Sequence, residues 1–583
     1  MVNPLMLFSA RPWARRAPRS MRRTEVEVPN QGPTTDAVFL VLRRLRVPLV
    51  VLIIIFGVSV AGLSAIPGQD SDGNPLRMTV FDAFYFMSYT ATTIGFGELP
   101  QPFTTTQRMW VTASIYSSVI GWAYAIGTMF GLIQEQGFRD AIATEQFRRR
   151  VRRIEEPFLI ISGFGHAGRL VAQGLDDLDR RFVVIDGQRS RIELLSADQL
   201  SVDPPGIHGD LRNPALLGLA GLGNRHCEGV LALTDNDDIN LATVMMVNLL
   251  RPDVPVIARC GDRLTEEHMH DFAPAAVINP YDRFGGYLLL ALNRPVTSQL
   301  VTWLLGGRSS RLPPLREGLA SGRWVVCADG QFGEEVSGDL RRAGLDVTVV
   351  DPARGDPDVT DVRGFVAGTE RDTANLSLAV HARLNNPDIF LVVRQKVHTN
   401  APLLQALHLD AVFMPTDLVA REMLARVVTP LFWSFIDHAL IQDDEWSAHI
   451  RDRLVEAGGT RTPNFQRVDI TPESTPAVHR WLVRGGSLTI GDLLRHHDDR
   501  ELLLPLVPLV VQRGEGMHVT PTRDFELAPG DRILLAGRTV ALGELTATLY
   551  YDSTVEYLAT GVNIPSTWVW RVLTARRRRA SPD

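Results

Sequence analysis

Hydrophobic positions divide the chain into an apolar part near its start and a longer part in which short apolar stretches alternate with polar ones. Residues 47–66 and 109–133 are two nearly uncharged apolar runs, and each is long enough to cross a bilayer as a helix. Between them, residues 80–92 are apolar and aromatic but too short to span a membrane. The pattern predicts a pore domain over residues 37–135, with two membrane-spanning helices and a re-entrant pore helix, because irregular backbone at membrane depth is tolerated only where it lines a water-filled path.

Arginine placement predicts how these spans are oriented. Arg43, Arg44 and Arg46 precede the first span, and five arginines at residues 148–153 follow the second. By the positive-inside rule, both termini and the long carboxyl-terminal part face the cytoplasm. We therefore expect a multi-pass protein of the plasma (inner) membrane, in contact with lipid. Residues 1–36, rich in Arg and Pro, are expected to form a disordered leader.

The residues after the pore helix suit an ion-selectivity filter. Stacked backbone carbonyls can replace the hydration shell of a monovalent cation, and glycine reaches the backbone angles that turn every carbonyl inward. The stretch Thr93-Ile94-Gly95-Phe96-Gly97 has this character and resembles the Thr-Val-Gly-Tyr-Gly signature of potassium channels. The resemblance implies a homotetramer around one pore, with K+ as the permeant ion. Because Phe96 lacks the tyrosine hydroxyl that can tether the filter from behind, a weakly selective cation channel of the same architecture is one alternative.

Two glycines of the second span are candidates for a gating hinge. Gly121 and Gly127 would let the inner helix bend, although close packing of neighbouring helices explains such glycines equally well. No segment carries arginine at every third position, so the sequence does not predict an arginine-rich voltage sensor. Residues 136–156 are charged and helix-prone, and we expect them to link the gate to a cytosolic sensor.

A dinucleotide-binding pattern begins directly after this linker. A short apolar strand at residues 158–161 leads into three spaced glycines and an amphipathic helix, and the next strand ends in an acid. The glycines let a phosphate approach the backbone at a helix start, and the acid can accept hydrogen bonds from ribose hydroxyls. The predicted ligand is NAD(H) or another adenine nucleotide. Its candidate contacts are Gly163, Phe164, Gly165, His166, Gly168, Asp186, Asp210 and Thr234.

The same succession of strands and helices occurs twice, which predicts two doubly wound α/β domains of the Rossmann type. The first copy resembles the regulator-of-potassium-conductance (RCK) domain, the TrkA-type lobe that forms gating rings beneath potassium channels. Asp186 corresponds to Asp351 at an offset of 165, whereas Asn240 corresponds to Asn375 at an offset of 135, so the second copy lacks 30 residues between these landmarks. We assign the first RCK unit, a Rossmann lobe with a helical crossover, to residues 157–322, and the second, a trimmed lobe with its own crossover, to residues 323–462. A small α+β subdomain with a basic tail is assigned to residues 463–583.

The second copy is a poorer ligand site. Ala328 replaces the first glycine, and Asp329 places a negative charge where a phosphate would lie. We therefore expect this unit to serve assembly and transmission. A nearby acidic stretch is a candidate for a divalent cation site or is a solvated loop; its members are Asp351, Asp356, Asp358 and Asp361.

Other chemistry is weakly indicated. Cys227, Cys260 and Cys327 lack metal-ligand spacing and are expected to be buried thiols of a reducing compartment. A membrane-anchored NAD-dependent oxidoreductase is the alternative from another class, because a dinucleotide pattern alone permits it. The chain shows no convincing His, Lys or Cys acid/base constellation in a substrate domain, so we expect neither enzyme activity nor a nucleic-acid partner.

Overall fold

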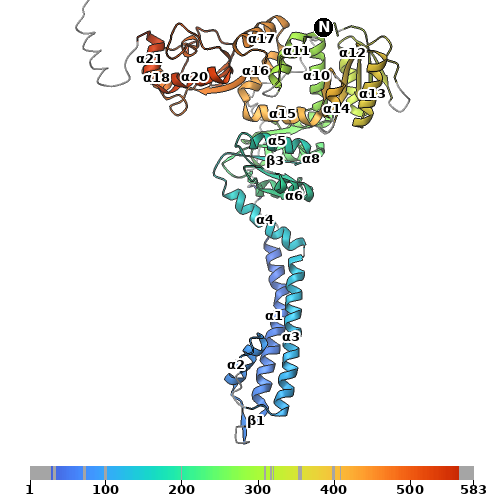
Figure 1. Cartoon of the computed structure of the whole chain (residues 1–583), viewed down its shortest axis with the longest axis vertical. Helices are drawn as coiled ribbons and strands as arrows, with labels where there is room; N and C mark the ends of the chain where they lie inside the picture. The colour runs from blue at the N-terminus through green and yellow to red at the C-terminus, as the bar shows by residue number, and fades with distance from the viewer. Residues whose placement is uncertain are drawn as a thin grey trace, which may run out of the picture.

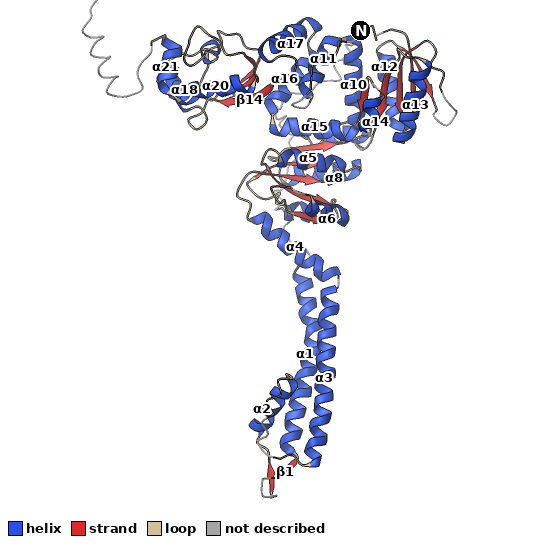
Figure 2. Ribbon diagram, viewed as in Figure 1, coloured by secondary structure: helices blue, strands red, loops and turns tan. Residues whose placement is uncertain are grey.

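The computed structural model describes residues 28–29, 34–69, 74–97, 102–134, 136–198, 200–306, 310–315, 318–319, 321–351, 357–396, 401–407 and 409–562. Over these residues the chain is elongated, with long helices at one end, the α/β parts at the other, and α4 (Gln136–Arg152) between them (Figure 1). Apart from one short hairpin, the strands belong to the α/β end (Figure 2). The predicted fold class, a helical membrane part followed by two Rossmann-like domains and a small α+β subdomain, is confirmed.

The membrane part consists of three helices and a hairpin: α1 (Thr34–Ala65), β1 (Pro67–Gln69), β2 (Pro75–Arg77), α2 (Val80–Ala91) and α3 (Thr105–Gln134). Among the residues that the structure describes, one helical segment, Leu45–Ala65, is long and apolar enough to cross a membrane. The second predicted span lies within α3, which runs beside α1 (Figure 1). Trp110 Nε1 donates to Ser59 O at 3.1 Å, and the Trp110 ring fills the space that a Cβ on Gly62 would need. Close approach of α1 and α3 therefore depends on this glycine.

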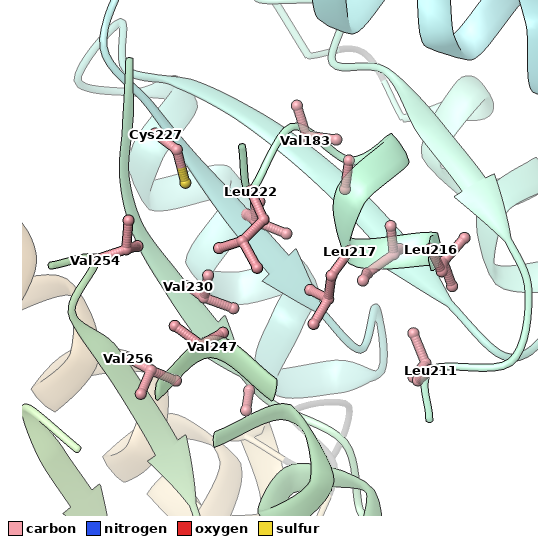
Figure 3. Close-up of a cluster of buried hydrophobic side chains, with 14 of the residues drawn as sticks. Val183, Leu211, Leu216, Leu217, Leu222, Cys227, Val230, Val247, Val254 and Val256 are labelled. Atoms are coloured by element: carbon pink, nitrogen blue, oxygen red, sulfur yellow. The ribbon is translucent and has the colours of Figure 1, made fainter. Parts of the chain in front are cut away.

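The first α/β lobe is a parallel six-stranded sheet in the order β5-β4-β3-β6-β7-β8. Its apolar strands are buried on both faces, as a sheet covered by helices requires. Figure 3 shows one side of this core, where Val183 and Val230 of the sheet meet Leu217 and Val247 of the covering helices. The strands are β3 (Phe158–Ser162), β4 (Arg181–Asp186), β5 (Gly206–His208), β6 (Cys227–Ala232), β7 (Val256–Arg259) and β8 (Ala276–Ile278), and the helices are α5 (His166–Asp176), α6 (Arg189–Ala197), α7 (Pro214–Leu219), α8 (Asp237–Leu250) and α9 (Arg263–His270).

The second lobe is a parallel five-stranded sheet in the order β10-β9-β11-β12-β13. It has no counterpart of β5 among the described residues, because β11 begins 12 positions after β10 ends, whereas β6 begins 41 positions after β4 ends. The 30 residues expected to be missing therefore correspond to an edge strand and its flanking helices. The elements are β9 (Arg323–Ala328), β10 (Asp346–Val350), β11 (Val362–Gly368), β12 (Phe390–Arg394), β13 (Ala411–Phe413), α12 (Gly330–Arg342), α13 (Asp372–Asn385) and α14 (Ala401–Ala406).

A buried hydrogen-bond network repeats in the two lobes and supports the internal duplication. In the first lobe, Asn240 Oδ1 accepts from Thr234 N at 3.0 Å, and Asn240 Nδ2 donates to Arg259 O at 2.9 Å. In the second, Asn375 Oδ1 accepts from Thr369 N at 2.8 Å, and its Nδ2 donates to the carbonyl of Arg394 at 2.9 Å. Each asparagine ties two adjacent strand ends together, so buried backbone groups find partners at the same place in both sheets.

The helices that follow each lobe are exchanged between the lobes. After the first lobe come α10 (Pro280–Asn293) and α11 (Pro295–Leu305), and after the second come α15 (Pro415–Val428), α16 (Pro430–Ile441) and α17 (Asp444–Gly458). Phe284 of α10 packs in the core of the second lobe, whereas Val419 and Met423 of α15 pack in the core of the first. Because each lobe is completed by a helix from the other, the two lobes fold as one interlocked unit (Figure 1).

The last part is a four-stranded antiparallel sheet in the order β14-β17-β15-β16; its own helices cover one face, and α11, α16 and α17 pack against the other. Its elements are β14 (Asn464–Asp469), α18 (Pro476–Val483), α19 (Ile490–Leu493), β15 (Leu506–Arg513), β16 (Gly516–Val519), β17 (Arg532–Gly537), α20 (Thr539–Tyr550) and α21 (Asp552–Thr560). The predicted basic tail lies outside the described residues. Most of the predicted leader does too, although Val28 packs against the core of the first lobe.

A buried carboxylate between the lobes gives a pH-dependent prediction. Asp339 of α12 is 4% exposed, and burial raises its pKa to about 6 although Arg342 lies beside it. Its stabilising contribution is therefore fully present below the ordinary Asp pKa and is lost as the pH rises through about 6. Asp339→Asn should raise the stability of the full chain at pH 8, on the order of 1–3 kcal/mol, and the gain should vanish near pH 4. Thermal unfolding at the two pH values measures this.

The matched control for this prediction is Glu334→Gln, because Glu334 lies on the exposed face of the same helix. Its unfolding temperature should follow that of the unmodified chain at both pH values. A stabilisation by Asp339→Asn that is equal at pH 8 and pH 4 would contradict the assignment of the effect to burial of the charged carboxylate.

Candidate functional site

The predicted filter has an alternating backbone. Thr93, Gly95 and Gly97 have φ values of 63°, 62° and 75°, and no such value occurs at Ile94 or Phe96. Left-handed residues at every second position turn successive carbonyls toward one side, which is the geometry that an ion-coordinating strand needs. Gly95 and Gly97 adopt these angles freely. Thr93 is a non-glycine residue in the left-handed region, so the backbone is strained at the first residue of this strand.

The amide side of this strand is tied to the pore helix. Ile94 N and Gly95 N both donate to Tyr89 O, at 3.0 and 3.2 Å. The Phe96 ring meets the Tyr89 ring edge to face, with centroids 6.0 Å apart. At the other end of α2, the Thr79 side chain caps the helix by accepting from Asp82 N at 3.1 Å. The amides therefore point toward α2, which leaves the carbonyls of the strand to the opposite side.

The two candidate hinge glycines differ in their surroundings. A Cβ on Gly121 would lie 2.9 Å from Ile55 Cδ1 and 3.1 Å from Leu52 Cδ2, whereas a Cβ on Gly127 would meet nothing within 4 Å. Close packing of α3 against α1 explains Gly121. Gly127 has no such steric reason, so it is the better hinge candidate of the two.

The glycine-rich turn of the first lobe has the geometry of an anion-binding turn. Gly163 has φ of 103°, and a Cβ there would lie 2.7 Å from Thr234 N. A Cβ on Gly168 would collide with Gly163 O, so this glycine lets α5 pack against the turn. Gly165 is the N-cap of α5 and contributes no side chain to its free amides. The turn therefore presents the start of an 11-residue helix, where amides and the helix dipole favour an anion.

Asp186 closes this turn from the neighbouring strand. It ends β4 and is 2% exposed. One carboxylate oxygen, Oδ2, accepts from Phe164 N at 2.6 Å, and the other, Oδ1, accepts from Gln188 N at 2.7 Å. Arg191 Nη1 lies 3.4 Å from Oδ2. Asp186 thus holds the glycine-rich turn to the end of β4, and a ribose hydroxyl would have to share a carboxylate that already has protein partners.

The other predicted contacts are placed less uniformly. Thr234 lies two residues after β6. Its N–H and its hydroxyl both donate to Asn240 Oδ1, so it helps to join the ends of β6 and β7. Phe164 is buried, whereas His166 is exposed at the first turn of α5. Asp210 follows β5, is exposed, and accepts from Arg212 N at 3.0 Å. The turn, Asp186 and Thr234 therefore meet at the carboxyl edge of β3, β4 and β6. The strand order reverses at this point, which is where open α/β sheets bind ligands. Asp210 lies one strand farther out, after β5.

Three charged residues at this edge were not among the predicted contacts. Arg191 and Asp235 face the turn, because a Cβ on Gly165 would lie 3.5 Å from Arg191 Nη1 and 3.7 Å from Asp235 Oδ2. Asp235 pairs with Arg259, which ends β7 and is largely buried. Arg191 lies in α6, five residues after Asp186. The sequence shows its charge, but it does not show that the side chain faces the turn. Arg259 is signalled by its place at a strand end.

The corresponding edge of the second lobe is filled by protein. Phe332 takes the place of Ala167 in the turn, is buried, and stacks on Phe413 with centroids 5.1 Å apart. Arg394 lies 5.1 Å from the centre of the Phe332 ring and pairs with Glu370 at 2.7 Å. Protein side chains therefore occupy this edge of the second lobe, and its expected role in assembly stays a prediction. Of the four acids named as a divalent-cation candidate, Asp356 lies outside the described residues, and no metal-ligating cluster is found around the other three within the described part of the chain.

Comparison with protein families matches both halves of this arrangement. The ion channel family matches residues 48–135, which hold the filter and most of α1 to α3, and the TrkA-N domain family matches residues 159–280, which span the first lobe. The chain carries an ion channel domain followed by a TrkA-N domain. The filter sequence resembles the first of these families, and the glycine-turn sequence resembles the second. The second lobe and the carboxyl-terminal sheet lie outside both matches.

Similar proteins include two potassium channels. Potassium channel protein 1 of Methanocaldococcus jannaschii is 22% identical over 41% of this chain and 67% of its own length. The voltage-gated potassium channel Kch of Escherichia coli is 23% identical over 37% of this chain and 50% of its own length. A protein of Methanothermus fervidus is 24% identical, and the match spans 34% of it. The chain thus spans between a third and two thirds of these relatives.

Among solved structures, the GsuK channel bound to NAD has a TM-score of 0.39 and 14% identity, with 88% of this chain and 99% of that one covered. The structure of the human SLO3 gating ring has a TM-score of 0.33 and 10% identity over 66% of this chain.

Proposed function

We propose that four copies of this chain form a potassium-selective channel whose gate responds to a cytosolic nucleotide bound in the first lobe. The observation that carries the proposal is the alternation of left-handed residues at Thr93, Gly95 and Gly97, directly after a short capped helix and between α1 and α3. One chain supplies one carbonyl-bearing strand, so a closed ring of chains is needed to surround an ion. The potassium channels among the relatives support the choice of ion.

A direct structural link supports coupling between the nucleotide turn and the gate. Helix α6 begins just beyond Asp186, and its first residue, Arg189, pairs with Asp140 of α4 at 3.0 Å. Farther along α4, Arg150 pairs with Asp203 of the first lobe at 2.8 Å, and Phe147 is buried in the lobe core. Since α4 follows α3 after one residue, a ligand that favours one position of α6 would also favour one position of the inner helix.

The ligand class follows from the charges around the turn. The helix start accepts a phosphate, and Asp186 favours an unmodified ribose over a 2′-phosphorylated one. Arg191 adds a cation beside the turn. We therefore propose NAD(H) or another adenine nucleotide as the regulator. A cytosolic position of both lobes, in a protein of the plasma (inner) membrane, is proposed with it, because the arginines after α3 favour that side.

An oxidoreductase is the weaker proposal. Burial raises the pKa of both Cys227 and Cys260 to about 12, so these thiols stay protonated and unreactive near neutral pH. His166 is exposed at the start of α5, within the glycine-rich turn. We propose that the first lobe binds its nucleotide for regulation, without chemical conversion.

The nucleotide site is tested by Gly163→Ala. An alanine Cβ at this position would sit 2.7 Å from Thr234 N, and its φ of 103° is strained for any L-residue. We expect the turn to shift and the affinity for NAD(H) or ADP, measured by calorimetry on the full chain, to fall at least about tenfold, which corresponds to roughly 1.4 kcal/mol.

Gly338→Ala is the control for this test, because it lies in α12 of the second lobe and a Cβ there meets nothing within 4 Å. It should bind as the unmodified chain does. The site assignment fails if Gly163→Ala, with an unchanged unfolding temperature, binds the nucleotides as tightly as the control.

A further inference from the structure

Two adjacent histidines in the carboxyl-terminal subdomain face a glutamate from a distant helix. His496, His497 and Asp498 follow α19, and each offers a ligand atom within 4.8 Å of the others. Glu544 projects from α20, so that its Oε2 lies 3.8 Å from His496 Nε2 and 3.4 Å from His497 Nδ1. We propose that this cluster is a binding site for a divalent transition-metal ion such as Zn2+.

The contacts of the two ring nitrogens of His497 point to a cation in the cluster. His497 Nε2 lies 3.2 Å from Asp498 Oδ2, a contact that favours hydrogen on Nε2 over Nδ1. The other ring nitrogen, Nδ1, is then left with its lone pair; it is buried and makes no hydrogen bond within the described part of the chain. A lone pair and a carboxylate oxygen 3.4 Å apart repel each other unless a positive charge lies between them. A carboxylate that orients a histidine in this way is a common partner of zinc ligands.

The spacing of the donors suits one small ion. Zinc lies about 2.0–2.2 Å from imidazole nitrogen and carboxylate oxygen, so two donors of a tetrahedral site are roughly 3.4 Å apart. Glu544 Oε2 lies 3.4 Å from His497 Nδ1 and 3.8 Å from His496 Nε2, which is close to this donor–donor distance. Imidazole favours Zn2+, Co2+ and Ni2+ over Mg2+ or Ca2+. His496, His497 and Glu544 are each between a fifth and two fifths exposed, which leaves an open side for entry and for a water ligand.

The loop that presents the histidines is held in place before any ion binds. His496 N donates to Leu502 O at 2.8 Å, and Arg500 N approaches the Tyr557 hydroxyl at 3.4 Å. The imidazole rings of His496 and His497 are stacked with centroids 4.5 Å apart. A held loop loses little conformational freedom on binding, which favours affinity.

The two histidines are not equivalent ligands. His496 Nδ1 accepts a hydrogen bond from Asp498 N at 3.2 Å, so its neutral ring carries hydrogen on Nε2. For a metal to bind His496 Nε2, that hydrogen must move to Nδ1 and the hydrogen bond from Asp498 N must break. His497 Nδ1 can bind a metal without such a change. We therefore expect the loss of affinity to be larger for His497→Ala than for His496→Ala.

The experiment titrates the full-length, tag-free chain in detergent, after treatment with a chelator and its removal. Co2+ binding is followed by visible absorption, and Zn2+ binding by calorimetry. One ion per chain is expected, with affinity reduced at least about tenfold in His497→Ala and in Glu544→Gln. The control is His449→Ala, an exposed histidine of α17 outside the cluster, which should bind as the unmodified chain does.

Two results would overturn the proposal. The first is the absence of saturable Co2+ or Zn2+ binding to the unmodified chain. The second is binding that persists unchanged in both His497→Ala and Glu544→Gln. Neither result depends on potassium conduction or on nucleotide binding, so this site stands or falls independently of the proposed function.

Discussion

Gly95→Ala should abolish potassium current while leaving the chain folded. Gly95 has φ of 62°, and its amide donates to Tyr89 O, so the peptide is fixed with its carbonyl on the far side of the strand. Alanine in the left-handed region costs about 1–2 kcal/mol, and in a tetramer four strands carry that cost together. The strand can relieve it by turning peptides, which removes carbonyls from the ion path. Current through purified protein in planar bilayers measures the effect.

Gly57→Ala is the matched control for the filter prediction. Gly57 also lies in the membrane part, but it has no positive φ, and a Cβ there would meet nothing within 4 Å. Its current and ion selectivity should equal those of the unmodified chain. Potassium-selective current through Gly95→Ala at an unchanged level would show that this stretch is not the filter.

Glu422→Gln should destabilise the interlocked lobes by about 3–5 kcal/mol, because it leaves buried arginines without their partner. Glu422 of α15 is 3% exposed and pairs with Arg426 at 2.8 Å and with Arg283 of α10 at 3.3 Å. Asp437 of α16 lies in the same cluster, where burial and, less strongly, the charge of Glu422 raise its pKa to about 6. This cluster holds the crossing of the two exchanged helices.

Denaturant unfolding of the full chain, followed by near-UV circular dichroism, tests the expected loss. The control is Arg421→Ala, the exposed neighbour on the same helix, which should change the midpoint little. Retention of the normal midpoint by Glu422→Gln would mean that the charges at this crossing are solvated or compensated by other groups.

The sequence predicted the parts of the fold that have local causes. The spacing of apolar residues predicted the helices of the membrane part, and the change in offset between Asp186 and Asn240 predicted the loss that corresponds to β5 and its flanking helices. The exchange of α10 and α15 was not predicted. Both helices are amphipathic, and apolar periodicity along a helix does not say which lobe its apolar face covers.

In the candidate sites, too, the sequence predicted what a residue type causes locally and missed what tertiary packing brings together. Gly163 and Gly168 mark the predicted phosphate turn because only glycine fits there, but Arg191 became visible only once α6 placed it 3.4 Å from Asp186. Positive φ at Gly95 was expected from its residue type, whereas the left-handed Thr93 had no signal, since threonine rarely adopts it. His497 and Glu544 are 47 positions apart, and sequence spacing cannot bring two such residues together.

The measurement that tests the central claim most directly is a recording from purified protein in a planar bilayer, with potassium on one side and sodium on the other. NAD(H) and adenine nucleotides are added in turn to the side that carries the lobes. We predict a reversal potential close to the potassium equilibrium value and a change in open probability with at least one nucleotide, and we predict that this change is lost in Gly163→Ala. A reversal potential near zero would contradict the filter assignment, and selective current indifferent to every nucleotide would contradict the sensor.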